Sequence, residues 1–398
     1  MKILLVHRYF WPDTPPYASI LRTIAEHLAT EGHDMHVLTA QPSYGGSDRH
    51  KKAARLEELN DVTVKRVPLI RESKTQPIRR GINLGLFAIQ VFFAVLRGDF
   101  DTVMAATTPP VFVALAARLA ARLRGATFVY HMQDIYPEVL AANSGHQLNF
   151  GLRLLRRIDA LNTRHADRVV VLSTDMQSSL SQRGHAVEHT HIINNFVPDA
   201  SHAPTSSPTV ISPTIPDSFQ VVFAGNLGNF QGLDEVIDAF RLLSERDVCA
   251  HLVLVGDGAA ELDLRERAGA LLDTTVFFNG RVSQGQAEEI IGVSDLALVT
   301  LNPGVIGTAF PSKTMTYLTS GTSVLAAVEE DSELATVLRE SGAGASCALD
   351  AESLAHGIAQ AAALPNSHPE KVKKFSESYA SPAARLPQWS ELFGNLNG

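Results

Sequence analysis

A lysine that follows one predicted strand and opens the next predicted helix is the residue whose surroundings most clearly indicate chemistry. Lys313 comes after a strand expected at residues 296–300 and lies in a helical pattern at 311–319. Pro311 suits the first helical position, and Ser312 and Lys313 then fall in the first turn, where backbone amides lack helical partners. Because these amides and an ammonium group both attract anions, the segment predicts a diphosphate site.

A glycine-rich turn between a strand and a helix supplies a second anion-binding candidate. The turn, residues 223–234, contains Gly225, Asn226, Gly228 and Gln231. Its backbone amides and the start of the following helix can surround a phosphate group. Glycine is also common in such turns for geometry alone, so the turn is weak support without Lys313. A further glycine turn at 255–258 is typical of a tight turn after a buried strand.

One of the fifteen histidines is distinguished by its place at the end of a strand. His131 ends the strand expected at 127–131 and shortly precedes Asp134. A histidine that emerges there into a cleft can donate to a substrate hydroxyl or accept its proton. Asp134 can orient this histidine or a sugar hydroxyl, and a helix cap before Pro137 is its alternative role.

The first loop between a strand and a helix disfavours one common class of protein. Residues 7–19 contain no glycine, whereas a dinucleotide site needs G-x-G-x-x-G there so that the backbone can approach the pyrophosphate. A nicotinamide dehydrogenase is therefore not expected. The aromatic and basic loop suits stacking on sugar rings and contact with a phosphorylated acceptor, with Arg8 and Tyr17 as acceptor contacts. Aromatic side chains that merely cap the domain are the alternative.

Metal and cysteine chemistry are not expected. Asp99 and Asp101 form a D-x-D motif, but they precede their strand and so lie at the edge opposite the cleft, where turn formation explains them. The sequence contains no H-E-x-x-H zinc motif. Cys249 and Cys347 are its two cysteines, which cannot form a disulfide framework and favour a reducing compartment.

The elements that must position these residues alternate between strand and helix along the chain. Strands are expected at residues 3–7, 34–39, 62–67, 102–105, 127–131, 168–172, 191–194, 220–224, 251–255, 275–279, 296–300 and 323–327. Helices are expected at 19–30, 110–124, 233–244, 259–272, 284–292, 311–319, 332–341 and 382–393. Such alternation is typical of parallel sheets covered by helices on both faces, an α/β fold.

A change in composition divides the 398 residues into two domains. Residues 201–217 are rich in serine, threonine, alanine and proline, as linkers are. We expect an N-terminal Rossmann-like domain at 1–200, a C-terminal one at 218–379, and a last helix within 380–398. Two doubly wound domains that face each other across a hinge place the ligand cleft at the carboxyl ends of both sheets.

Charge is distributed unevenly over these two halves. The net charge is −8, but residues 1–200 carry 23 Lys+Arg against 18 Asp+Glu, or +5, which leaves 11 against 24, or −13, for the rest. The balance argues against nucleic-acid binding. An apolar run at 84–96 is shorter than the ~20 residues that cross a bilayer. With Lys74, Arg79 and Arg80 beside it, this run predicts either a helix on a membrane surface or a core helix with a solvated basic start.

Taken in order, these segments resemble the retaining glycosyltransferases of family 4, which have the GT-B fold. The similarity covers essentially the whole chain, and the branch it favours includes colanic-acid and O-antigen type transferases. The motifs that carry it are Lys2-Ile3-Leu4, residues 29–39, residues 131–138, Gly225-Asn226-Leu227-Gly228 with Gln231-Gly232-Leu233, residues 254–258, Pro311-Ser312-Lys313 and residues 331–335.

The resemblance implies that the C-terminal domain binds a nucleotide-diphosphate sugar and that the N-terminal domain binds an acceptor. Lys313 and the turn from Gly225 to Gly232 would hold the diphosphate, and the final helix would cross back onto the N-terminal domain. Arg281 and Val282 would meet the base. Further donor contacts are expected at Thr308, Ala309, Phe310, Ser312 and Thr316, and catalytic roles at His131, Asp134 and Lys313.

The chain departs from the wider family in two places. Asn226 and Gln231 stand where many members have an arginine and a lysine in the phosphate turn. Thr308 and Thr316 stand where many members have two glutamates eight residues apart, one of which usually contacts the ribose. Lys313 is thereby left as the chief cationic group.

The function expected from the sequence is metal-independent transfer of a hexose, with retention, from a nucleotide sugar to a hydroxyl group. The expected donor is a UDP-sugar, with no other cofactor, and the expected acceptor is lipid-linked or a polysaccharide precursor. The expected location is the cytoplasm, as a peripheral protein on the inner face of the membrane. Three alternatives stay open: a nucleotide-sugar 2-epimerase of the same fold, a non-catalytic donor-binding partner subunit, and transfer to a soluble natural-product acceptor.

Overall fold

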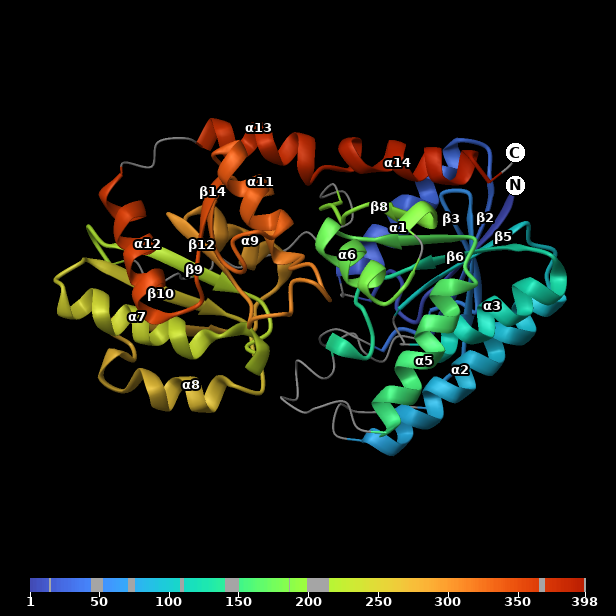
Figure 1. Ribbon diagram of the computed structural model, residues 1–398, viewed down its shortest axis with the longest axis horizontal. Coiled ribbons are helices and arrows are strands. Elements are labelled where there is room, and N and C mark those ends of the chain that lie inside the picture. Colours follow the sequence, from blue (N-terminus) through green and yellow to red (C-terminus); the bar gives the residue numbers. More distant parts are fainter. Residues whose placement is uncertain are drawn as a thin grey trace.

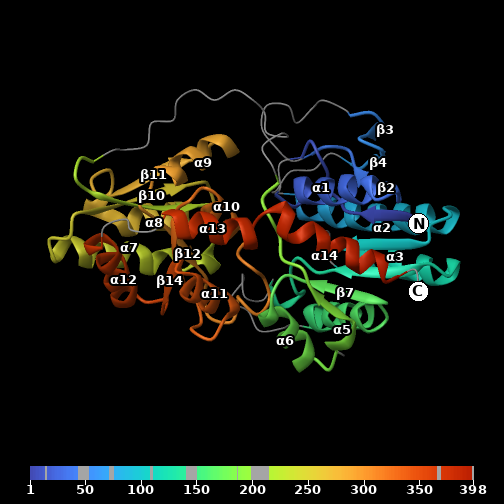
Figure 2. The same ribbon diagram turned by 90° about the horizontal axis from the view of Figure 1, so that it is seen from above.

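The computed structural model consists of two α/β domains, each built around its own sheet (Figures 1 and 2). It describes residues 1–13, 16–43, 53–70, 76–107, 111–139, 150–185, 187–198, 215–364 and 369–396. The α/β class and the two doubly wound sheets expected from the sequence are confirmed. Most of the linker expected at 201–217 lies outside the described residues, as does Lys74.

The first sheet has eight strands in the order β3-β4-β2-β1-β5-β6-β7-β8. They are β1 (Lys2–Val6), β2 (Asp34–Ala40), β3 (Leu56–Leu59), β4 (Val62–Val67), β5 (Thr102–Ala106), β6 (Thr127–His131), β7 (Arg168–Val171) and β8 (Thr190–Ile192). Only the β3–β4 pair is antiparallel among the described pairs of this sheet. One face is covered by α2 (Pro77–Arg97), α3 (Phe112–Arg124), α5 (Phe150–Arg164) and α6 (Thr174–Gln182), and the other by α1 (Pro16–Thr30).

Strand β1 shows why both faces must be covered. Side chains of a strand point alternately to opposite faces of the sheet. Ile3 and Leu5 pack into the core under α1, whereas Leu4 and Val6 pack into the core under α2 and α3. All four are buried. A strand that is apolar on both sides requires a helix layer on each side.

The second sheet has six parallel strands in the order β11-β10-β9-β12-β13-β14. They are β9 (Phe219–Ala224), β10 (Ala250–Val255), β11 (Val276–Gly280), β12 (Leu296–Thr300), β13 (Ser323–Ala327) and β14 (Gly344–Cys347). Helices α7 (Leu233–Glu245), α8 (Glu261–Ala268) and α12 (Ala351–Ala363) cover one face. The other face is covered by α9 (Gln284–Gly292), α10 (Lys313–Thr319), α11 (Glu333–Ser341) and α13 (Pro369–Tyr379).

Both strand orders reverse at one place, between β1 and β5 in the first sheet and between β9 and β12 in the second. At such a switch point, the loops that leave neighbouring strands diverge and open a crevice at the carboxyl edge. The loop after β9 contains Gly225, and the loop after β12 leads to Lys313. The topology therefore brings the two segments with predicted anion sites to one switch point.

Two glycines after β10 allow the loops after β9 and β10 to pack backbone against backbone. A Cβ on Gly256 would lie 1.9 Å from the carbonyl oxygen of Gly225, and one on Gly258 would lie 2.2 Å from that of Leu227. The amide of Gly225 donates to Val255 O at 2.8 Å, and the amide of Leu227 donates to Asp257 O at 2.9 Å. Because no side chain fits between these two loops, the turn at 255–258 fixes the position of the loop after β9.

The C-terminal helix returns to the first domain, as the resemblance implied. Helices α13 and α14 (Pro382–Gly394) run one after the other along the top of Figure 1, from the second domain to the first. Trp389 and Phe393 are buried in the core under α1. Ser390 of the same helix lies 2.9 Å from His27 Nε2 and donates to Glu31 at 2.6 Å. The end of the chain therefore belongs to the N-terminal domain.

Some expected elements differ from those observed. Strands β3 and β14 were not expected, because the sequence of β3 is charged and that of β14 is short and rich in small residues. The helix expected at 259–272 ends at Ala268, and Gly269 follows with a φ of 53°. Pro311 is not the first helical residue, since α10 begins at Lys313 and the amide of Thr314 donates to Pro311 O at 3.0 Å in a preceding turn.

The contact at Gly256 predicts that Gly256→Ala destabilises the protein by about 2–3 kcal/mol, because a Cβ would overlap the backbone and the φ of 134° is strained for any side chain. The measurement is chemical denaturation. Gly85→Ala in α2 is the control, since its Cβ would meet nothing within 4 Å. It is expected to raise stability by about 0.5–1 kcal/mol. Equal stability of the two variants would contradict the packing argument.

Candidate active site

The ammonium group of Lys313 lies in a small cage at the switch point of the second sheet. Lys313 Nζ donates to Gln231 Oε1 at 2.9 Å and lies 3.6 Å from the centre of the Phe223 ring. A Cβ on Gly225 would lie 3.7 Å from Lys313 Nζ, so the missing side chain leaves the cation open to the turn. Burial lowers the pKa of Lys313 well below the ordinary value for a lysine. No carboxylate pairs with Lys313 within the described part of the chain.

Helix α10 positions the glycine turn as well as the lysine. The Tyr317 hydroxyl, one turn after Lys313, accepts from the amide of Ala224 at 2.8 Å and is fully buried. Thr300 Oγ1 donates to the carbonyl oxygen of Gln231, and the amide of Asn302 donates to Phe230 O at 2.9 Å. Both switch-point loops are therefore held together at several points. Sequence reasoning missed Tyr317, although its i+4 spacing from Lys313 placed the two side chains on one helix face.

A partly buried cation that no described carboxylate neutralises is an arrangement that can bind an anion. Desolvating an ammonium group is costly unless hydrogen bonds or a counter-charge compensate, and one amide oxygen with one aromatic ring compensates only in part. A diphosphate placed against the open side at Gly225 would supply the missing charge. Asn226, the next residue of this turn, is exposed.

His131 lies in an aromatic cluster of the first domain. The Nδ1 atom of His131 is 2.7 Å from the Tyr17 hydroxyl, and the centres of the His131 and Trp389 rings are 4.9 Å apart. His7 contacts the Tyr17 ring at a centroid distance of 4.7 Å. Burial lowers the pKa of His131 to about 3 and that of His7 to about 4, so both rings are neutral at physiological pH. His131 and Tyr17, predicted separately, are thus brought into direct contact.

Neighbouring amide groups fix the tautomer of His131. Asn195 Nδ2 donates to Gln133 Oε1 at 2.8 Å, which leaves Gln133 Nε2 to donate to His131 Nε2 at 2.8 Å. A neutral ring that accepts at Nε2 carries its proton at Nδ1, and this proton is donated to the Tyr17 hydroxyl. Both ring nitrogens of His131 are therefore engaged within the protein. The expectation that the His131 ring meets a substrate hydroxyl directly must be corrected to contact through Tyr17 or after a shift of Gln133.

The segment after β6 contacts the second domain. The amide of Ile135 donates to Thr308 O at 2.7 Å, and Asp134 forms an isolated antiparallel bridge with Ala309. Burial raises the pKa of Asp134 to about 6. The backbone of Thr308 and Ala309, expected to contact the donor, thus lies against the segment of the predicted catalytic residues.

A buried ionic network holds this segment in place. Arg183 donates to Asp159 Oδ2 at 3.2 Å and pairs with Glu138. Tyr130 directly precedes His131 in β6, and its hydroxyl donates to Asp159 Oδ1 at 2.7 Å. Asp159 is fully buried, and burial raises its pKa to about 6 despite these partners. The network ties α5 and α6 to the two ends of the segment from Tyr130 to Glu138.

Two helix N-termini face each other across the domains and are capped reciprocally. Glu333 of α11 accepts from the amide of Thr174 at 2.6 Å and from its hydroxyl at 2.9 Å, at the start of α6. Asp175 of α6 accepts from the amide of Glu333 at 3.0 Å. Acidic groups are favourable at helix N-termini because unpaired amides concentrate there. Sequence reasoning included Glu333 in a family motif but could not show its partner in the other domain.

The other residues predicted to contact the acceptor or the donor differ in exposure and in hydrogen bonding. Arg8 is 7% exposed, and its guanidinium lies 5.4 Å from the Tyr9 ring centre. Thr308 donates its hydroxyl to Val305 O at 2.9 Å. Ser312 precedes α10 without a side-chain cap, and Arg281 is exposed after β11. The other predicted donor contacts are partly or fully buried: Val282, Phe310 and Thr316.

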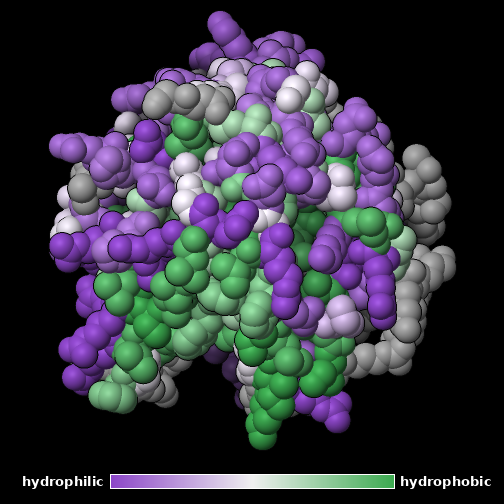
Figure 3. Space-filling view, turned by 90° about the vertical axis from the view of Figure 1, so that its right-hand side faces the viewer, coloured by the Kyte–Doolittle hydropathy of each residue, from purple (hydrophilic) through white to green (hydrophobic). Residues whose placement is uncertain are grey.

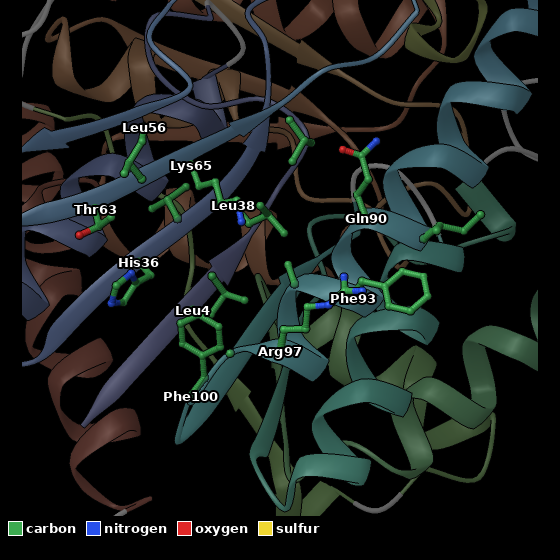
Figure 4. Close-up of a pocket in the computed structure, with 15 residues that line it drawn as sticks. Leu4, His36, Leu38, Leu56, Thr63, Lys65, Gln90, Phe93, Arg97 and Phe100 are labelled. Carbon is green, nitrogen blue, oxygen red and sulfur yellow. The ribbon is translucent and has the colours of Figure 1, made fainter.

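Two cavities of the described structure lie away from this site. One, of about 560 Å³, opens between α2 and the strands β2 and β4 and includes His36, Lys65 and Arg97 (Figure 4). The other, of about 500 Å³, lies between α2 and α3. Neither includes a predicted site residue. The described residues contain no group of three or more His, Cys, Asp or Glu side chains that could hold a metal.

Two domain families match the chain, one for each sheet. Residues 17–195 match the family described as glycosyl transferase 4-like domain. Residues 218–363 match the family described as glycosyl transferases group 1. The boundary between these matches falls in the proline-rich segment before β9.

Relatives match over most of their length. The chain is 26% identical over 401 residues to an Escherichia coli protein named as the colanic acid biosynthesis glycosyl transferase WcaI, covering 95% of this chain and 96% of that one. It is 25% identical over 285 residues to a Pseudomonas aeruginosa protein named as the glycosyltransferase WbjE, covering 70% of each. The Anabaena HepE structure, solved with UDP and glucose, has a TM-score of 0.68 at 16% identity and covers 99% of this chain and 100% of that one. This likeness shows the fold, which is GT-B.

Asp134 predicts a pH-dependent effect on stability. Its folded pKa of about 6 lies above the ordinary 3.8, so its ionised form is destabilising, and this cost develops as pH rises from about 4 to 6. Asp134→Asn is therefore expected to be more stable than the wild type by about 1–3 kcal/mol at about pH 7.5 and equally stable near pH 4. Chemical denaturation at both pH values measures this. Asp247→Asn, at an exposed position, is the control, and a gain that does not change with pH would count against burial as the cause.

Proposed function

Because the chain belongs to the glycosyltransferases that combine a glycosyl transferase 4-like domain with a group 1 domain, we propose that it transfers a sugar with retention from a nucleotide-diphosphate sugar to a hydroxyl group. The observation that carries the proposal is the Lys313 cage at the switch point of the second sheet. This cage lacks a carboxylate in the described structure and opens toward the glycine turn. A diphosphate has the charge that complements this cage, and the cage lies at the sheet edge where such a ligand is expected.

In this proposal the donor lies along the carboxyl edge of the second sheet. Lys313 and the amides of the Gly225 turn bind the diphosphate, and the loops after β11, at Arg281 and Val282, contact the base. UDP is the nucleotide we propose, supported by HepE, whose structure was solved with UDP and glucose. The Gln231 amide oxygen keeps Lys313 in position, and its amide nitrogen is a further donor for phosphate oxygens.

The proposed chemistry needs no protein nucleophile. The bond between sugar C1 and the leaving phosphate oxygen breaks, and its electron pair stays on that oxygen. The acceptor oxygen bonds to C1 on the same face, and the acceptor proton moves to the leaving phosphate oxygen. Lys313 stabilises the developing charge of the diphosphate. Threonines at 308 and 316, in place of carboxylates, are consistent with this route, because no carboxylate pair suited to double displacement stands there.

The acceptor is proposed to approach from the first domain. His131 donates through Nδ1 to the Tyr17 hydroxyl, so the Tyr17 proton is free to point to another acceptor oxygen. We propose that Tyr17 positions the acceptor hydroxyl and that neutral His131 orients Tyr17. Asp134, beside the domain contact, is the group proposed to bind a sugar hydroxyl. A lipid-linked or polysaccharide-precursor acceptor, supported by the names of the relatives, would place the enzyme at the inner face of a membrane.

The charge of Lys313 is the direct test of the donor site. Lys313→Met keeps the apolar stem and removes the buried charge, so the folded state should be at least as stable as the wild type. UDP affinity is expected to fall about 10–100-fold, the value of a lost charge-assisted hydrogen bond. Isothermal titration calorimetry measures it, with the exposed Lys371→Met as the matched control. Unchanged UDP affinity in Lys313→Met would remove the basis of the proposal.

Incubation with donor alone separates the candidate activities. A thermal-shift panel of nucleoside diphosphates and their sugars first identifies the donor, because ligand binding to the folded state raises the midpoint. UDP and a UDP-sugar are expected to give the largest shifts. Slow hydrolysis or no reaction without acceptor, and transfer with it, supports the proposal. A 2-epimerised donor would establish the epimerase instead, and binding without turnover on any acceptor would establish a partner subunit.

A further inference from the structure

Three neighbouring helices of the first domain leave an unusually apolar outer surface. Helix α2 exposes a row of side chains spaced four or more residues apart: Ile78, Ile82, Ile89 and Phe93. Helix α3 adds Phe112, Leu119 and Leu123, and α5 adds Phe150, Leu154 and Leu161. The three helices lie side by side in Figure 1, and Figure 3 shows apolar side chains gathered in the lower part of the face that it views, with a hollow between them.

The hollow between α2 and α3 is apolar and open. It has a volume of about 500 Å³ and is lined by Gly81, Leu84, Gly85, Phe92, Phe112 and Leu119, among others. Packing does not require glycine at positions 81 and 85, since a Cβ on either would meet nothing within 4 Å. Glycine inside a helix lowers stability by about 0.5–1 kcal/mol relative to alanine. Helix α2 thus has two unfavourable residues at the lining of the hollow.

The charges on these helices are nearly all positive. Helices α2, α3 and α5 contain ten arginines and a single acidic residue, Asp159, which is fully buried. Nine of the arginines are exposed: Arg79, Arg80, Arg97, Arg122, Arg124, Arg153, Arg156, Arg157 and Arg164. Arg124 and Arg156 pair with Asp99 and Glu138. Lys65 beside Arg97 adds a further charge at the cavity of Figure 4. Apolar rows edged by arginine fit an anionic bilayer surface, where aliphatic groups bury and guanidinium groups meet phosphates.

Helix α2 itself can lie on a membrane but cannot cross one in this fold. Its segment Ile78–Arg97 is long and apolar enough to span a bilayer, a correction to the shorter apolar run expected from the sequence, and only 22% of it is buried. Its inner face nevertheless packs on the sheet through Phe87, Val91 and Val95, which are at most 1% exposed. A helix fixed along a sheet by one face presents only its other face to lipid.

We propose that the outer face of α2, α3 and α5 docks the enzyme on the surface of an anionic lipid bilayer, with the α2–α3 hollow receiving a lipid chain. The inference rests on the proposed function, because it supplies the surface from which a lipid-linked acceptor would enter. It extends the sequence-based expectation, which named Lys74, Arg79 and Arg80, to three helices.

The test is co-sedimentation of the full chain with vesicles, which needs neither donor nor acceptor. We expect binding to phosphatidylglycerol–phosphatidylethanolamine vesicles at low salt, at least tenfold weaker binding to phosphatidylcholine vesicles, and weakening by added salt. The variant Ile89→Asp, Phe93→Asp, Leu123→Asp should lose at least tenfold in affinity. Its control is Leu262→Asp, Val293→Asp, Leu364→Asp, which changes three exposed apolar residues of the second domain and should bind like the wild type.

A second pair of variants tests the arginines, and both variants change the net charge by the same amount. Arg79→Gln, Arg80→Gln, Arg122→Gln should weaken binding to anionic vesicles, whereas Lys371→Gln, Lys373→Gln, Lys374→Gln on α13 should not. Nucleotide thermal shifts of all variants separate the two proposals, since they should stay unchanged even where vesicle binding is lost. Three results would overturn the proposed docking surface. The wild type could stay in the supernatant, or a variant and its control could lose equal vesicle affinity. The third is a dimer of the wild type that the apolar variant abolishes.

Discussion

An ammonium group that has no carboxylate partner among the described residues organises the ligand edge of the second domain. Keeping Lys313 charged next to Phe223 and Gln231 is unfavourable until an anion arrives, as the lowered pKa shows. The surrounding structure supports that state: Tyr317 holds Ala224, and Gly256 admits the backbone of Gly225. The cation is therefore preorganised, and a diphosphate that bound as proposed would not have to reorient side chains.

The two domains contact each other next to the predicted catalytic segment. Ile135 bonds to Thr308, and Glu333 and Asp175 cap each other's helices across the same junction. In each of these bonds a backbone amide is the donor, and the acceptors are the carbonyl oxygen of Thr308 and the carboxylates of Glu333 and Asp175. The same junction places Asp134 where burial makes its carboxylate unfavourable. Stability is thus given up at the position that the proposed function assigns to binding a sugar hydroxyl.

Much of the site could be predicted because local sequence determines it. A strand that ends before a glycine turn, and a strand that ends before Lys313, lie at one edge in any parallel sheet. The state of His131 could not be predicted, since Gln133, Asn195 and Tyr17 come from three separate segments. Strand β3 was missed because its sequence, Leu-Glu-Glu-Leu, lacks β-branched residues and is held by pairing with β4. Pro311 was misplaced because helix starts depend on tertiary turns as well as on propensity.

The uneven charge of the chain follows from where its arginines lie. Ten of the 23 basic residues in the first half are on α2, α3 and α5, which contribute only one of its 18 acidic residues. Solvated helices usually mix both signs, because i,i+4 pairs of opposite charge stabilise them. Helices that forgo such pairs, expose isoleucine, leucine and phenylalanine, and keep glycines at positions 81 and 85 are poorly suited to water on their outer side. An anionic, partly apolar surface compensates all three features at once, whereas water or an acidic protein surface compensates only the charge.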